Sequence, residues 1–145
     1  MSAYTHLLLA VDFSANTDHV ISKGLLLAGA FGARISLVHV VEFAQVDLSN
    51  ELVMPQELEL DQELLALAEK QLQDAAEKHG LADRPLHVRQ GSTKREILQL
   101  AEQEGIDLIV IGSHGRSGLQ LLLGSTANAV LHGAPCDVLA VRVKG

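Results

Sequence analysis

The sequence has few aromatic residues and a single cysteine. Its 145 residues include three phenylalanines, one tyrosine and no tryptophan, so a core must be built from aliphatic side chains. This scarcity argues against a nucleic-acid surface that stacks bases on exposed rings. Cys136, as the lone cysteine, excludes an intramolecular disulfide, and no cysteine–histidine spacing resembles a zinc site.

Basic clusters and long apolar runs are also missing. The formal net charge is -7, and the 11 lysines and arginines are scattered along the chain. An acidic chain repels phosphate backbones, which disfavours DNA or RNA as a partner. No stretch reaches the roughly 20 apolar residues that span a membrane, and the first residues carry no basic leader. We therefore expect a cytoplasmic protein without a membrane span.

The amino-acid composition is typical of one globular domain. With 48% hydrophobic and 20% charged residues, the chain can bury an aliphatic core. The length fits a single domain over residues 1–145, and no linker or low-complexity tract divides it.

Short apolar segments alternate with helical segments along the chain. Strands are predicted at residues 6–11, 33–41, 86–90, 107–111 and 136–143. Helices are predicted between them, up to residue 31 and over residues 57–79, 93–104 and 125–132. This pattern indicates an α/β fold with a parallel sheet covered on both faces. We expect a doubly wound, Rossmann-like sheet of five strands in the order 3-2-1-4-5.

Two local features complete this prediction. Thr93 followed by Glu96 has the spacing of a capping box and predicts the start of the third helix. Residues 42–55 show no clear period and predict a long loop, which would cover a ligand or contact a partner.

The glycine-rich stretch after the fourth predicted strand carries the main functional signal. It reads GSHGRSG from Gly112, and the sequence GST from Gly124 then begins a helix. Glycines let backbone N–H groups turn toward an anion, and a helix N-terminus adds unpaired N–H groups and a positive dipole end. Two anion-binding devices therefore lie at the two ends of one segment, which predicts a nucleotide site. The pattern is neither a Walker loop nor a dinucleotide fingerprint, and a plain connecting loop is the alternative.

Asp12 closes the first predicted strand. In the expected strand order it faces the Gly112 loop across the crevice where the winding of the sheet reverses. A carboxylate at that place repels phosphate unless a divalent cation lies between them. We therefore expect ATP bound together with Mg²⁺, with Asp12 close to the metal; the alternative is that Asp12 only caps the following helix.

Several segments resemble the universal stress protein A family. They are AVDFS at residues 10–14, LVHVV at 37–41, GSHGRSG at 112–118, GST at 124–126 and APCDVLAVR at 134–142. The similarity covers essentially the whole chain. ATP-binding members of that family carry a glycine, two residues, a glycine, about nine residues, and then glycine with serine or threonine. Eight residues separate Gly115 from Gly124 here, one fewer, which shifts the register of the connecting turn.

The resemblance implies the ATP-binding branch of that family and a set of binding residues. The adenine would be bordered by Val11 and Val40, with Asp12 near the ribose and metal. The backbone of Gly112, His114 and Gly115 would contact ribose and phosphates, and the phosphates would lie on Gly124, Ser125 and Thr126. Arg116, the one cation in the segment, either binds phosphate or faces solvent. Family members also pair their last strands in a homodimer, here the strand that begins at Val138 and ends at Val143.

Three functions remain open at this point. The first is an ATP-binding regulatory or stress-response module, in which the nucleotide shifts a conformational equilibrium that an unidentified protein partner reads. The second is a slow ATPase or phosphotransferase, and the third is a dimeric interaction module with a vestigial pocket. No catalytic residue is assigned. His114 is interpreted as a backbone contributor, and His39 as a hydrogen-bonded core histidine.

Overall fold

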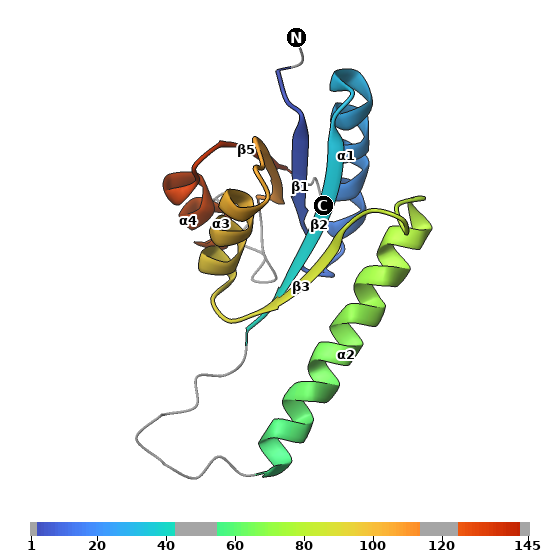
Figure 1. The fold of residues 1–145 in the computed structure, drawn as a ribbon, viewed down its shortest axis with the longest axis vertical. Coiled ribbons are helices and arrows are strands. Elements are labelled where there is room, and N and C mark those ends of the chain that lie inside the picture. Colours follow the sequence, from blue (N-terminus) through green and yellow to red (C-terminus); the bar gives the residue numbers. More distant parts are fainter. Residues whose placement is uncertain (1–2, 43–54, 114–124, 143–145) are drawn as a thin grey trace.

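The computed structural model describes residues 3–42, 55–113 and 125–142, without the side chains of residues 55–60. In these parts of the chain, strands and helices alternate as the sequence predicts (Figure 1). The strands are β1 His6–Ala10, β2 Arg34–Val41, β3 Leu86–Gln90, β4 Leu108–Gly112 and β5 Asp137–Val141. The helices are α1 Thr17–Phe31, α2 Pro55–Lys78, α3 Thr93–Gln103 and α4 Ser125–Gly133.

The strands form one parallel sheet in the order β3-β2-β1-β4-β5. The predicted order is therefore confirmed, and the winding reverses between β1 and β4. Leu7 in the central strand lies opposite Ile35 of β2 on one side and Leu108 of β4 on the other. The carboxyl ends of β1 and β4 are thus neighbours at the edge where doubly wound sheets bind ligands.

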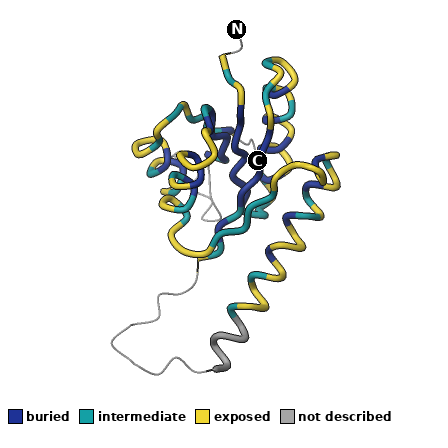
Figure 2. Tube along the Cα trace, viewed as in Figure 1, coloured by how far each residue is buried: buried dark blue, intermediate teal, exposed yellow. Residues whose placement is uncertain are grey.

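The side chains of β1 alternate between two hydrophobic cores, one on each face of the sheet. Leu7, Leu9 and the residue after the strand, Val11, belong to the core that α1 and α2 cover, together with Val20, Ile21, Ala28, Leu72 and Ala76. Leu8 and Ala10 belong to the core that α3 and α4 cover, together with Ile97, Leu100, Ala101, Ala127 and Val130. All five residues of β1 are buried, which explains the apolar run from Leu7 to Ala10 (Figure 2).

The start of α3 differs from the prediction. Its N-cap is Ser92, whose hydroxyl accepts a hydrogen bond from the Arg95 N–H at 3.4 Å. Thr93 is the first residue of the helix, so the capping box read from Thr93 and Glu96 is wrong by one position. The Thr93 hydroxyl instead donates to the Glu42 carboxylate, a contact from another element that local spacing does not predict.

The N-terminal part of α2 extends beyond the carboxyl ends of the strands (Figure 1). The side chains of Leu64, Leu67 and Gln71 in α2 line the space at that end of the sheet. Within the described residues, no helix combines the length and hydrophobicity that crossing a bilayer requires.

Candidate functional site

A cavity of about 650 Å³ lies at the carboxyl ends of β1, β2 and β4. All four helices contribute to its lining, which includes Asn16, Thr17, Leu64, Leu67, Gln71, Thr93, Ile97, Ser125 and Thr126. Its size falls within the range of roughly 300–1,000 Å³ that small-molecule sites occupy. The cavity therefore lies where the doubly wound topology predicts a ligand site.

Six of the ten residues predicted to bind nucleotide line this cavity: Val11, Asp12, Val40, Gly112, Ser125 and Thr126. The other four, His114, Gly115, Arg116 and Gly124, lie outside the described residues, as does most of the predicted loop over residues 42–55. The structure thus brings Asp12 to the same space as Gly112 and the first turn of α4, as the expected strand order requires.

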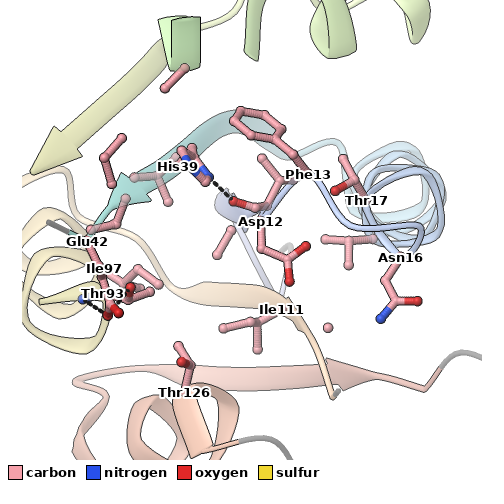
Figure 3. A pocket seen from close by; sticks show the side chains of 18 of the residues that line it. Asp12, Phe13, Asn16, Thr17, His39, Glu42, Thr93, Ile97, Ile111 and Thr126 are labelled. Atoms are coloured by element: carbon pink, nitrogen blue, oxygen red, sulfur yellow. Dashed lines mark hydrogen bonds between the residues drawn. The ribbon is translucent and has the colours of Figure 1, made fainter. Parts of the chain in front are cut away.

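Asp12 is held by a local turn that leaves it at the end of β1. Its Oδ1 atom accepts the Ser14 N–H at 2.9 Å, and the Ser14 hydroxyl accepts the Asn16 N–H at 3.2 Å. These side-chain-to-backbone bonds are typical of turns that contain Asp and Ser. The N-cap of α1 is Asn16, so Asp12 does not cap that helix. Figure 3 shows the Asp12 carboxylate on the side of the cavity that holds Ile111 and Thr126.

Phe13 and His39 form an aromatic wall that the sequence did not predict. Phe13 adopts a left-handed backbone conformation with φ 60°, which costs a bulky residue about 1–2 kcal/mol. Its ring stacks on the His39 imidazole with centroids 4.0 Å apart and an angle of 29° between the planes. Aromatic pairs of this kind contribute about 0.5–1.5 kcal/mol, which offsets much of the backbone cost.

The His39 side chain is fixed by a hydrogen bond across the sheet. Its Nδ1 atom lies 2.7 Å from the Val11 carbonyl oxygen, and because a carbonyl only accepts, Nδ1 carries the proton. The imidazole is half-buried and lines the cavity (Figure 3). The interpretation of His39 as a hydrogen-bonded histidine is therefore confirmed, but it lies in the cavity wall and not deep in the core.

Glu42 is a second acidic group in the cavity. It follows the last residue of β2, and its Oε1 atom accepts the Thr93 N–H at 3.1 Å and the Thr93 hydroxyl at 2.6 Å (Figure 3). These two hydrogen bonds lower the pKa of the Glu42 carboxyl, so it is ionised at neutral pH. The rule that singled out Asp12, a carboxylate directly after a buried strand, would also have found Glu42.

The described lining carries acidic groups but no lysine or arginine. A polyphosphate in this space would meet Asp12, so it needs either a cation or oriented backbone N–H groups. The first turn of α4 contains no acidic residue and begins with Ser125 and Thr126. Among the described residues, no three histidine, cysteine, aspartate or glutamate side chains lie close enough together to hold a metal ion. Asp12 fits Mg²⁺ together with phosphate oxygens and water, since this ion is usually bound by one or two carboxylates and the phosphates of a substrate.

The fold and cavity define a doubly wound α/β protein with a ligand-sized space at its switch point. The sequence profile of the Universal stress protein family matches residues 3–142, and the chain belongs to that family. Universal stress protein A homolog 1 of Coxiella burnetii is 39% identical over 141 residues, which cover 97% of this chain and 98% of the relative. Universal stress protein YxiE of Bacillus subtilis is 32% identical, with 96% and 99% covered.

Solved structures agree with this assignment. Universal stress protein UspA from Lactobacillus plantarum superposes with a TM-score of 0.81 at 26% identity, covering 98% of this chain and 100% of its own. A universal stress protein solved in complex with cAMP superposes with a TM-score of 0.67 at 20% identity, covering 97% and 98%. At 20% identity, the similarity to the cAMP complex is a similarity of fold.

Proposed function

We propose that this chain is a nucleotide-binding regulatory module that takes ATP with Mg²⁺ in the cavity beside β1 and β4. The observation that carries the proposal is the convergence of Asp12, Gly112 and the N-terminus of α4 on one space. The α4 end offers serine and threonine hydroxyls and a positive dipole end to phosphates. The apolar side chains of Val11 and Val40 offer a surface to the base.

Magnesium, when bound, supplies positive charge between the phosphates and the protein. Asp12 would hold it, because this carboxylate lies on the side of the cavity that faces Thr126 and is fixed by the Ser14 N–H. The residues of the chain then orient the nucleotide and exclude water. No side chain is assigned to hydrolysis, and we propose a conformational output read by a protein partner.

Binding is tested by thermal unfolding and calorimetry with ATP, with and without Mg²⁺. A ligand specific for the native state stabilises it by about 2.7 kcal/mol at a concentration 100 times its Kd, so ATP·Mg²⁺ should raise the Tm. Asp12→Asn should weaken this effect about tenfold or more, while Asp74→Asn on the exposed face of α2 serves as the control. An unchanged affinity after chelation of Mg²⁺ would remove the metal role of Asp12.

The same experiment separates the alternative functions. ATP turnover by purified protein that is lost in Asp12→Ala would make the nucleotide a substrate of a slow ATPase or phosphotransferase. If millimolar ATP does not raise the Tm, the chain is better explained as a dimeric interaction module with a vestigial pocket. Titration with cAMP, the ligand of one structural relative, shows whether a single phosphate satisfies the site.

A second proposal, homodimerisation, is favoured by the edge of the sheet at β5. This strand pairs with β4 on one side and ends the sheet on the other. A hollow beside it is lined mainly by apolar side chains of α1, α4 and β5, among them Leu27, Phe31, Leu131, Val138 and Leu139. An edge strand next to an apolar surface is suited to pairing with a second copy of the chain.

A further inference from the structure

Three helix N-termini line the same cavity, those of α1, α3 and α4, and the one of α3 is filled by the protein's own anion. Thr93 begins α3, and its N–H and hydroxyl both donate to Glu42 Oε1, at 3.1 and 2.6 Å. The Ser92 hydroxyl accepts the Arg95 N–H, so the backbone N–H groups of Thr93 and Arg95 both have side-chain acceptors. The Glu42 carboxylate therefore occupies the place where a helix N-terminus would attract a phosphate.

The N-terminus of α4 differs from the other two in charge, since the first turn of α1 contains Asp18. The first turn of α4 has no acidic residue, and its first residues, Ser125 and Thr126, line the cavity. The first turn of α3 contains Glu96 in addition to the contact from Glu42. Two carboxylates thus oppose the positive end of α3, whereas none in the first turn opposes that of α4.

The Glu42 carboxylate is fixed and charged. The two hydrogen bonds from Thr93 lower its pKa, and they hold Oε1 against α3. In the same part of the cavity lie Val40 and Ile97, whose side chains are buried and apolar. This end of the cavity accepts an uncharged group with N–H donors, such as a nucleobase, and repels a second anionic group.

We infer that Glu42 is a specificity-determining residue of the cavity: it blocks the N-terminus of α3 to phosphates, so that only ligands with their anionic groups confined to the α4 end bind well. The inference rests on the proposed nucleotide binding. It adds a selection against ligands that carry negative charge at both ends. A nucleotide carries its charge at one end and satisfies both ends of the cavity. An inorganic polyphosphate is charged throughout its length and does not.

The test is a charge series at Glu42, measured by calorimetric titration with ATP and with tripolyphosphate, both with Mg²⁺. Glu42→Gln keeps the size of the side chain and a carbonyl oxygen that can accept from Thr93, but removes the charge. We expect the preference for ATP over tripolyphosphate to fall about fivefold, the size typical of one charge at a helix N-terminus. Glu42→Lys should reduce the preference further.

Glu102→Gln is the matched control, because Glu102 is exposed on the same helix near its other end. It makes the same change in net charge and should leave the preference as in the wild type. Equal gains in affinity for both ligands in Glu42→Gln, or an unchanged preference, would overturn the role of Glu42. Failure of the wild-type protein to bind ATP would instead overturn the proposed function, so the two failures are distinguishable.

Discussion

At the scale of single residues, His6 is a buried histidine with both ring nitrogens in hydrogen bonds. Nδ1 lies 3.3 Å from the Glu104 carbonyl oxygen and therefore carries the proton, while Nε2 accepts from the Ser36 hydroxyl at 2.7 Å. Burial lowers the pKa of His6 below its usual 6.5, helped by the nearby charge of Arg34. The folded state therefore holds this imidazole neutral.

This arrangement predicts a loss of stability in mild acid. Below pH 6.5 the unfolded imidazole takes up a proton more readily than the folded one, so the free energy of unfolding falls as the pH drops. Urea unfolding at about pH 7.5 and about pH 5.5 measures the difference. His6→Gln should lose stability at the higher pH but depend less on pH. His19→Gln, at an exposed position of α1, is the matched control, and a wild-type slope in His6→Gln would contradict the prediction.

The sequence predicts that Asp12 and Gly112 share one site, but it does not predict the contacts of Phe13 and Glu42. Asp12 and Gly112 could be brought together because strand order alone decides which strand ends are neighbours. The stack of Phe13 on His39 depends on a positive φ at a phenylalanine, which no local rule favours. The bond from Thr93 to Glu42 joins two elements, and local spacing gave Thr93 a different role.

At the scale of elements, α1 packs closely on β1 at Gly24. A Cβ atom at this position would lie 2.4 Å from Leu9 Cδ2, and Leu9 is fully buried. By contrast, a Cβ atom at Gly29 in the same helix would meet nothing within 4 Å. The two glycines therefore have opposite expected responses to alanine.

Gly24→Ala should destabilise the protein by about 1 kcal/mol. The overpacking costs about 1–3 kcal/mol, and the better helix propensity of alanine returns about 0.5–1 kcal/mol. Gly29→Ala should gain only that propensity term and stabilise the protein. Chemical denaturation of both variants checks the pair, and a stabilised Gly24→Ala would show that Leu9 can move aside.

Element boundaries follow from the sequence to within a few residues. The long helix was predicted over residues 57–79 and spans Pro55–Lys78, because proline is compatible with the first turn of a helix. The last strand was predicted over residues 136–143 and is Asp137–Val141 in the described part of the chain. Periodicity identifies the buried part of an element well, and its ends poorly, since hydrogen bonding from other elements decides where the ends lie.

At the scale of the whole molecule, the predicted dimer can be tested through two exposed leucines. Leu131 of α4 is 47% exposed and lines the hollow beside β5, whereas Leu26 of α1 is 67% exposed and does not. Leu131→Glu should weaken self-association about tenfold or more, because it places a charge in an apolar interface, while Leu26→Glu should not. Analytical ultracentrifugation measures both, and a wild-type monomer at high concentration would rule out the proposal.

The central position of β1 also has a consequence for synthesis of the chain. β1 is made before the other four strands, and β2 follows to pair with one of its edges. The partner of the other edge is β4, where Leu108 lies opposite Leu7, so two further strands and three helices must be translated first. Until then the most buried strand of the protein exposes an apolar, unpaired edge, which is a template for pairing with other chains. A ribosome that stalls before Leu108 would therefore release an aggregation-prone fragment.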